Sequence, residues 1–384
     1  MSPAMIRLTR KGVRRWHGGH PWIFRSDVAQ LPEGVSQGAI ASVGTHQGRR
    51  LGRAAWSDHA QLCLRRMPVA ADEPDLDGWL RLLHAAIARR DLDHPCARLV
   101  NGDADGLPGL VVDRFGPGLG LQMTTQAAER FKAPTIAALS DLLSPAVVVL
   151  RNDTRTRAYE GLEAEKRLVV GDQSQVEVEV DALRWVYDLM EGQKTGGYLD
   201  QLENQRATAR LASGEGLDCC SYEGGFALRM ARAGCAVTAL DSSAPALARL
   251  RGHAQRNQLS VDTVEENVFD ALRTYDREGR RFDTVVLDPP PFARSRKALP
   301  AARRAYKELN LRALKILRPG GLLVTCSCSA HVSGVDFERI VADAAADAKR
   351  WARVVDRRGA PADHPTLLLA PETDYLKALF IEVD

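Results

Sequence analysis

The feature that most constrains the fold is a change of hydrophobic period in the C-terminal half. From about residue 171, short apolar segments alternate with segments of helical periodicity, the pattern of a parallel sheet covered by helices. Strands are predicted at 216–220, 236–241, 262–267, 282–288 and 321–327. Helices are predicted to begin near Phe226, Pro245, Val268 and Ala301. The sequence therefore predicts a doubly wound α/β domain over residues 171–384.

The rest of the chain predicts two more domains, because 384 residues exceed one ordinary hydrophobic core. Residues 1–70 contain short β-like segments broken by Gly and His, which indicate a small β-rich domain. Residues 74–170 are expected to form an α+β middle domain. Its predicted elements are a helix, a hairpin, a strand, a second helix and a second strand, at 79–92, 98–116, 119–125, 130–143 and 146–150.

Charge is concentrated at the N-terminus. Residues 1–70 carry 11 Lys and Arg against 3 acidic residues, whereas the whole chain has a formal net charge of only +3. A basic domain on a mildly acidic body suits attraction to a polyanion, although a solvated basic surface is the alternative. Arg14, Arg15 and the interleaved aromatic Trp22 are the candidate contacts to a nucleic-acid substrate.

Several classes of protein are not expected. The N-terminal residues lack an apolar run long enough for a signal peptide, and no segment has about 18 consecutive apolar residues, so a cytoplasmic protein without membrane spans is expected. The 7 cysteines show no paired spacing of the kind that forms a zinc site. Reduced thiols and no bound metal are therefore expected.

Residues that follow the predicted strands are the candidate ligand contacts, because open α/β sheets bind ligands beyond the carboxyl ends of their strands. Asp218 is followed by Gly224 and Gly225, which allow a sharp turn, but no GxGxxG motif for NAD is present. Asp241 has the spacing of a ribose-binding acid. Either Asp alone can be a helix cap, but the pair suits S-adenosylmethionine, which has an ammonium group and ribose hydroxyls.

Two later segments extend this candidate site. Asn267 follows the third strand, where its side chain either meets an adenine amino group or caps a helix. Asp288 is followed by three prolines and Phe292, and the prolines stiffen a loop after the fourth strand. Asp288 can hydrogen-bond to a base edge, while Phe292 can stack on a base.

The fifth strand ends with two cysteines. Cys326 and Cys328 are expected on one face of the strand, with Cys328 nearer to its carboxyl end and to the pocket. An unpaired cysteine at this place is either a buried apolar residue or a nucleophile, because a thiolate adds readily to an electron-poor ring carbon.

Several segments in this order resemble the bacterial and archaeal large-subunit ribosomal RNA cytosine-5 methyltransferases. The resemblance covers almost the whole chain and implies a PUA domain, an α+β middle domain and a class I Rossmann-like methyltransferase domain. It also implies S-adenosylmethionine as cofactor and ribosomal RNA as partner, and homodimers are common in the family. The matching segments are GHPWIF (19–24), LVNGDADGLPGLVVDRFG (99–116), RNDTRTRAYEGL (151–162), GQKTGGYLDQLENQR (192–206), DCCSYEGGFAL (218–228), LDPPPFARS (287–295), SCSAH (327–331) and the closing ADHP and YLK.

The resemblance also implies roles for single residues. The family more often has Asp at the position of Asn267, and Cys326 falls where other members have residues other than cysteine, so Cys326 is expected to be a packing residue. Cys328 matches the nucleophile of the family. The implied cofactor contacts are Tyr198, Asp200, Arg206, Ser221, Tyr222, Gly224, Gly225, Phe226, Asp241 and Asn267, to which the residues themselves add Asp218 and Asp288.

The implied reaction begins with addition of the Cys328 thiolate to carbon 6 of cytosine, while Asp288 holds the base edge near N3. Many RNA cytosine-5 methyltransferases carry a second Cys after the fourth strand, but here that loop is DPPPF, so the base for the last step is unassigned. Enzymes that methylate exocyclic amines have similar loops and form the first alternative. A non-catalytic RNA-binding assembly factor is the second.

Overall fold

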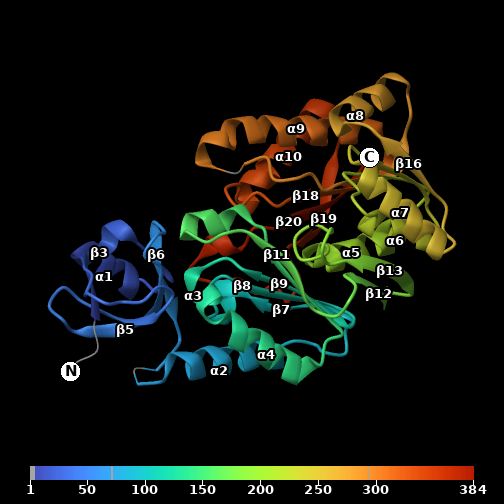
Figure 1. Cartoon of the computed structure of the whole chain (residues 1–384). Coiled ribbons are helices and arrows are strands. Elements are labelled where there is room, and N and C mark those ends of the chain that lie inside the picture. Colours follow the sequence, from blue (N-terminus) through green and yellow to red (C-terminus); the bar gives the residue numbers. More distant parts are fainter. Residues whose placement is uncertain (1–4, 71, 294) are drawn as a thin grey trace. The chain divides into compact units, whose positions relative to one another are not determined.

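The computed structural model describes residues 5–70, 72–293 and 295–384. It divides into two compact units (Figure 1). The first contains Met1–Leu199 with Ala362–Pro371, and the second contains Asp200–Pro361 with Glu372–Asp384. The second unit therefore consists of two chain segments, and the segment between them, Ala362–Pro371, belongs to the first unit.

The N-terminal part of the first unit is built on a six-stranded sheet of order β2-β6-β5-β4-β1-β3. Apolar side chains such as Ile6, Ile23 and Trp56 form its own buried core. Helix α1 was not predicted from the sequence, and Thr9 starts it by accepting a hydrogen bond from the backbone of Gly12. The elements are β1 (Met5–Leu8), α1 (Arg10–His17), β2 (Trp22–Phe24), β3 (Val28–Gln30), β4 (Ile40–Gly44), β5 (Arg50–Trp56) and β6 (Leu62–Met67).

The remainder of the first unit is a five-stranded sheet of order β11-β10-β9-β8-β7, followed by a two-stranded hairpin. Trp79 of α2 is fully buried, and its indole nitrogen donates to the Thr135 hydroxyl of α4 at 2.9 Å. The elements are α2 (Asp75–Ala88), β7 (Cys96–Asn101), β8 (Leu110–Phe115), β9 (Gly118–Met123), α3 (Gln126–Arg130), α4 (Lys132–Leu143), β10 (Val147–Asn152), β11 (Glu165–Val170), β12 (Gln175–Val180) and β13 (Leu183–Asp188).

The second unit is a seven-stranded sheet of order β16-β15-β14-β17-β18-β20-β19. Its first five strands are parallel, and β20 pairs antiparallel to β18. The elements are α5 (Leu202–Leu211), β14 (Glu215–Cys219), α6 (Gly225–Arg232), β15 (Ala236–Asp241), α7 (Ala244–Arg256), β16 (Val261–Glu265), α8 (Val268–Arg277), β17 (Phe282–Leu287), α9 (Leu299–Ile316), β18 (Leu317–Ser327), α10 (Gly334–Ala348), β19 (Ala352–Arg358) and β20 (Lys377–Val383).

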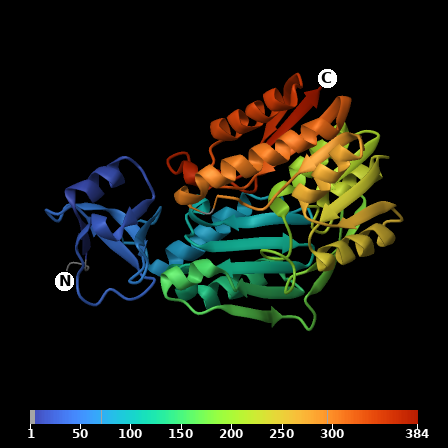
Figure 2. The ribbon, with the colours of Figure 1, turned by 90° about the horizontal axis from the view of Figure 1, so that it is seen from above.

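Both faces of this sheet are buried, because successive side chains of a strand point to opposite faces. In β17, Val285 and Leu287 join the core under α8, α9 and α10, whereas Val286 joins the core under α6 and α7. Helices α9 and α10 lie side by side on their face of the sheet (Figure 2). The predicted doubly wound α/β architecture is confirmed.

Two expectations about the elements need correction. The alternation of strand and helix begins at α5 and β14 rather than near residue 171, because residues 175–188 pair locally as the β12–β13 hairpin in the first unit. The two C-terminal strands β19 and β20 were not predicted. The limits of the three domains, 1–70, 74–170 and 171–384, stay a prediction.

Helix α7 carries an acid-sensitive group. His253 is buried, and burial together with the positive charges of Arg256 and Arg249 lowers its pKa to about 4. An unfolded chain protonates this imidazole near its ordinary pKa, so stability falls as the pH drops from about 6.5 towards 4. We expect His253→Gln to remove about 2–3 kcal/mol of the stability difference between pH 7 and pH 4.5. Guanidinium unfolding of both proteins at both pH values measures this, and equal pH dependence would contradict it.

Candidate active site

The strand order of the second unit reverses between β14 and β17, which is the place where open α/β sheets bind ligands. Residues 220–225 follow β14 and residues 288–292 follow β17, so both predicted segments lie beyond the carboxyl ends of these adjacent strands. The structure thus brings together the acidic, glycine-containing loop and the proline-rich loop that the sequence indicated.

The loop after β14 has an unusual backbone. Cys220 and Tyr222 have φ angles of 60° and 50°, and Gly224 has a φ angle of 89°. Residues other than glycine rarely adopt this left-handed backbone conformation. Such strained residues persist where the surrounding structure holds them. Here the Tyr222 backbone N–H donates to Asp241 at 2.8 Å.

Asp241 is the residue that organises this loop. One carboxylate oxygen accepts from the Tyr222 backbone, and the other accepts from the backbone N–H of Ser243 at 2.9 Å. Each carboxylate oxygen has a second lone pair, so Asp241 can hold the loop and still accept a hydroxyl hydrogen from a ligand. This arrangement is compatible with the predicted ribose contact.

Two buried polar atoms provide a test of fit for the cofactor. Among the residues that the structure describes, Asp218 Oδ1 and Ser221 Oγ are buried without a hydrogen-bond partner. Burial raises the pKa of Asp218 well above its ordinary value, and the charges of Asp288 and Asp241 raise it further. Buried polar groups usually have partners, so these atoms fit a ligand that brings hydrogen-bond donors such as an ammonium group and hydroxyls.

The glycines of the loop serve close packing. A Cβ added at Gly225 would lie 2.3 Å from Nε2 of Gln205, and one added at Gly224 would lie 2.8 Å from Cγ of Leu250. Phe226 is only 4% exposed and packs in the core under α6 and α7. Its side chain therefore anchors the start of the helix.

Asp288, after β17, is held by a residue that sequence reasoning did not single out. The Gln201 side chain is buried and donates from Nε2 to Asp288 Oδ1 at 2.8 Å. Oε1 of the same Gln201 accepts from Asn204 at 2.7 Å, which fixes the orientation of the amide. The neighbouring Asp200 accepts a 2.6 Å hydrogen bond from the Tyr375 hydroxyl. Gln201 thus contacts the loop after β17, and Asp200 contacts the segment before β20.

The two cysteines at the end of β18 have different environments. Cys326 is fully buried in the hydrophobic core, and burial raises the pKa of its thiol well above the ordinary value. Cys328 follows the last strand residue, is half-buried, and has its sulfur 3.8 Å from the carbonyl oxygen of Pro289. Cys328 is therefore the thiol that adjoins the proline-rich loop.

A hydroxyl network connects this cysteine loop to the proline-rich loop. Ser327 donates to the Tyr306 hydroxyl at 3.0 Å, and Tyr306 lies 2.9 Å from the Ser329 hydroxyl. Ser329 Oγ in turn accepts from the backbone N–H of Ala293 at 3.2 Å. The residues on either side of Cys328 are thus fixed, which places the thiol at a defined position.

Phe292 and Asn267 have structural contacts. The Phe292 ring lies 4.8 Å from the Tyr306 ring and 6.2 Å from the Phe269 ring. Asn267 caps α8 by accepting from the backbone of Phe269 at 2.9 Å, which is one of the two roles considered for it. Stacking of a base on Phe292 and an adenine contact of Asn267 stay predictions.

The other predicted residues have these surroundings. Arg206 in α5 pairs with Glu203 at 2.6 Å, and Tyr198 belongs to the first unit with Lys194 4.6 Å from its ring centre. Arg14 is exposed in α1. Arg15 pairs with the buried Asp27 at 3.1 Å and lies over the Phe24 ring, and Trp22 makes an edge contact with His20. The roles of all five stay predictions.

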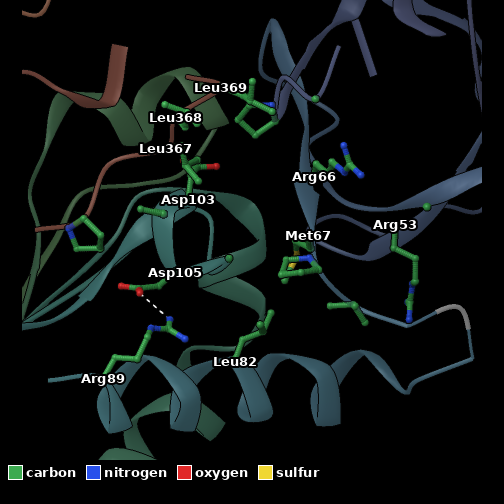
Figure 3. A pocket seen from close by; sticks show the side chains of 18 of the residues that line it. Arg53, Arg66, Met67, Leu82, Arg89, Asp103, Asp105, Leu367, Leu368 and Leu369 are labelled. Carbon is green, nitrogen blue, oxygen red and sulfur yellow. Dashed lines mark hydrogen bonds and ion pairs between the residues drawn. The ribbon is translucent and has the colours of Figure 1, made fainter. Parts of the chain in front are cut away.

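A separate pocket of about 1010 Å³ lies within the first unit (Figure 3). Four arginines line it, yet its cations have partners, because Arg89 and Arg90 both pair with Asp105. Leu368 in its lining is exposed, whereas Leu82 and Met67 are buried and add little accessible apolar surface. Among the described residues that line the pocket there is no cysteine or serine.

Sequence reasoning missed Gln201, Tyr306, Tyr375 and Lys377. Gln201 lies inside the GQKTGGYLDQLENQR segment and Tyr375 and Lys377 lie inside YLK, so the matching segments were the available signal. Their partners are far away in the sequence, which prevents any local pattern from predicting the contacts. In the described part of the chain, no cluster of three or more potential metal ligands occurs. Nor does any described helix have the length and apolarity to cross a membrane.

The doubly wound sheet and the acidic, glycine-containing loop at its switch point define the class of Rossmann-like methyltransferases that use S-adenosylmethionine. Residues 149–381 match the family model described as S-adenosylmethionine-dependent methyltransferase, and residues 6–67 match a PUA-like domain. The chain belongs to this methyltransferase family and, within it, groups with the ribosomal RNA large subunit methyltransferases I. The predicted fold class and the predicted cofactor are confirmed.

The similar proteins cover nearly the whole chain. Ribosomal RNA large subunit methyltransferase I from Erwinia tasmaniensis is 38% identical, with 95% of each chain covered. The protein of the same name from Salmonella arizonae is 36% identical, covering 95% of this chain and 94% of its own. A solved methyltransferase, SMU.776 complexed with SAH, has a TM-score of 0.84 at 18% identity and covers 99% of this chain and 100% of its own. That structural likeness concerns the fold.

Proposed function

We propose that this protein methylates carbon 5 of a cytosine in large-subunit ribosomal RNA through a covalent adduct with Cys328. The observation that carries the proposal is the position of Cys328, half-buried beyond the end of β18 and in contact with the Asp288 loop. A thiol at this point can add to carbon 6 of a pyrimidine ring. Methylation of an exocyclic amine does not use a thiol.

Two observations support ribosomal RNA as the substrate. The similar proteins are named ribosomal RNA large subunit methyltransferase I. In addition, residues 6–67 match a PUA-like domain, and this part of the chain carries the excess of basic residues. Positive charge attracts RNA by releasing its counterions. Arg14, Arg15 and Trp22 are the proposed RNA contacts in this domain.

The residues of the chain have separate tasks in this proposal. Asp218, Ser221 and Asp241 hold the cofactor, because they present acceptor oxygens at the carboxyl ends of β14 and β15, those of Asp218 and Ser221 being buried. S-adenosylmethionine, when bound, supplies an electrophilic methyl group.

The remaining tasks concern the base. Cys328 forms a bond to carbon 6, which moves electron density to carbon 5 and makes that carbon nucleophilic. Asp288 accepts a hydrogen bond from the base edge, with Gln201 keeping its carboxylate in place. Once carbon 5 has received the methyl group, loss of the carbon 5 proton and cleavage of the bond to Cys328 restore the aromatic ring and release the thiolate.

The product of the reaction tests this proposal. The protein is incubated with labelled S-adenosylmethionine and unmodified large-subunit ribosomal RNA, with small-subunit RNA as the control, and the RNA is digested to nucleosides. We expect label in 5-methylcytidine from large-subunit RNA. An N-methylated nucleoside would favour the exocyclic-amine alternative, and no methylation of any RNA would favour the non-catalytic alternative.

A further inference from the structure

Lys377 begins β20 and is brought beside the cysteine loop by the sheet register. β20 runs antiparallel to β18, and Lys377 is paired with Ser327, the last residue of β18. Cys328 is the next residue after Ser327. Although lysine is rarely buried, the Lys377 side chain is only 9% exposed.

Two hydrogen bonds fix the ammonium group of Lys377. Nζ donates to the backbone carbonyl oxygens of Ser329 and Tyr375, each at 2.8 Å. Ser329 directly follows Cys328 in the sequence. The hydrogen bond to its carbonyl oxygen therefore holds the positive charge at the residue next to the cysteine. An ammonium group has three N–H bonds, and these two carbonyls use two of them.

The electrostatic surroundings support an interaction with Cys328. Burial lowers the pKa of Lys377 to about 8, whereas the negative charges of Asp374 and of a Cys328 thiolate act in the opposite direction. Lys377 is therefore still mostly protonated near pH 7. A buried ammonium group is poorly screened by water, so its attraction for a neighbouring thiolate is larger than at the surface.

Two other described titratable groups that interact with Cys328, Tyr306 and Cys326, carry no positive charge. Tyr306 of α9 interacts with the Cys328 charge and has a raised pKa, chiefly through burial. Cys326 of β18 interacts with Cys328 and with Asp288. An ionised Asp288 disfavours a second negative charge nearby, so a thiolate at this site needs an opposing cation.

We propose that Lys377 is a positioning residue that keeps Cys328 in its thiolate form. The thiol proton passes to water, and the resulting thiolate is held against the ammonium group, so no redox partner is required. This inference deepens the proposed function, because it supplies the reactive form of the proposed nucleophile. It explains why the YLK segment has a lysine directed to a buried position.

Alkylation of Cys328 by iodoacetamide tests the inference in the full-length protein without RNA. Only the thiolate reacts, so the rate as a function of pH reports its ionisation, and mass spectrometry of the Cys328 peptide separates it from the other cysteines. We expect the wild-type midpoint below about pH 8.5, the ordinary value for a thiol. Lys377→Met is expected to raise the midpoint by about one pH unit and to slow alkylation at pH 7 about 10-fold.

Three comparisons make the test specific. Lys377→Arg keeps the charge and is expected to retain the low midpoint. Lys307→Met removes a lysine that pairs with Asp347 on α10, and it is expected to change nothing at Cys328. Cys220 is an internal reference in every sample, because burial and nearby acids raise the pKa of its thiol. Thermal melting and cofactor binding show which variants are folded.

Several outcomes would overturn the inference. A wild-type midpoint at or above about pH 8.5 would do so even if Lys377→Met failed to fold. An unchanged midpoint in folded Lys377→Met would do so as well. The proposed function fails separately: a Lys377-dependent midpoint without 5-methylcytidine formation supports the inference alone, whereas 5-methylcytidine with a Lys377-independent midpoint supports the function alone.

Discussion

Cys328→Ala is expected to lower methyl transfer to large-subunit RNA by at least about 1,000-fold, because removal of a covalent nucleophile typically has an effect of this size or larger. Without the thiol, carbon 5 of cytosine is not activated for attack. The Cys328 sulfur contacts Pro289 in the loop after β17, so the affinity for S-adenosylmethionine is expected to stay within about 2-fold. Single-turnover methyl transfer and calorimetric cofactor binding measure the two effects.

Cys326→Ala is the matched control for this substitution. Cys326 lies two residues earlier, within β18, and is fully buried in the core. Its replacement leaves a small cavity, for which we expect a loss of about 1 kcal/mol in stability and little change in methyl transfer. Full activity of Cys328→Ala, or equal losses in the two variants, would contradict the assignment of the nucleophile.

Asp241→Ala is expected to weaken S-adenosylmethionine binding about 100-fold or more. The Asp241 carboxylate accepts backbone hydrogen bonds from Tyr222 and Ser243, and it is the proposed ribose acceptor. Hydrogen bonds to a charged group contribute about 1.5–3 kcal/mol each, so their loss disorganises the left-handed loop and removes a ligand contact. Calorimetric titration with the cofactor in the absence of RNA measures this effect.

Asn267→Ala provides the comparison for Asp241→Ala. Asn267 is exposed and caps α8, so its loss is expected to reduce stability by about 1 kcal/mol. If Asn267 contacts adenine as well, cofactor affinity also falls, but by less than for Asp241→Ala. A cofactor affinity of Asp241→Ala equal to that of the wild type would show that the loop after β14 is not the cofactor site.

The sequence was sufficient to predict the parallel strands of the α/β sheet. The segment predicted at 236–241 coincides with β15, Ala236–Asp241, because apolar residues run through a strand that is buried on both faces. β19, Ala352–Arg358, was missed since it is a charged edge strand with mostly exposed side chains, and such a segment lacks the hydrophobic signal. Helix α1 was missed because its short, mostly basic sequence resembles a polar loop.

The candidate site was predictable only in part, for a topological reason. Residues at the carboxyl ends of strands, such as Asp218 and Asp288, are located by the rule that ligands bind there. Contacts between distant segments are not encoded locally: Gln201 meets Asp288 87 residues away, and Lys377 meets Ser329 48 residues away. Only the three-dimensional structure shows that these side chains hold the predicted residues in place.

The central claim is covalent catalysis by Cys328 at the cytosine ring, and trapping the adduct tests it most directly. Large-subunit RNA containing 5-fluorocytidine has fluorine in place of the proton that must leave carbon 5, so the final elimination is blocked. Incubation with S-adenosylmethionine is predicted to give a denaturation-resistant protein–RNA adduct with wild type and with Cys326→Ala, attached through the Cys328 peptide, and no adduct with Cys328→Ala. Methylation of the fluorinated RNA without any adduct, or an adduct through a different residue, would contradict the account.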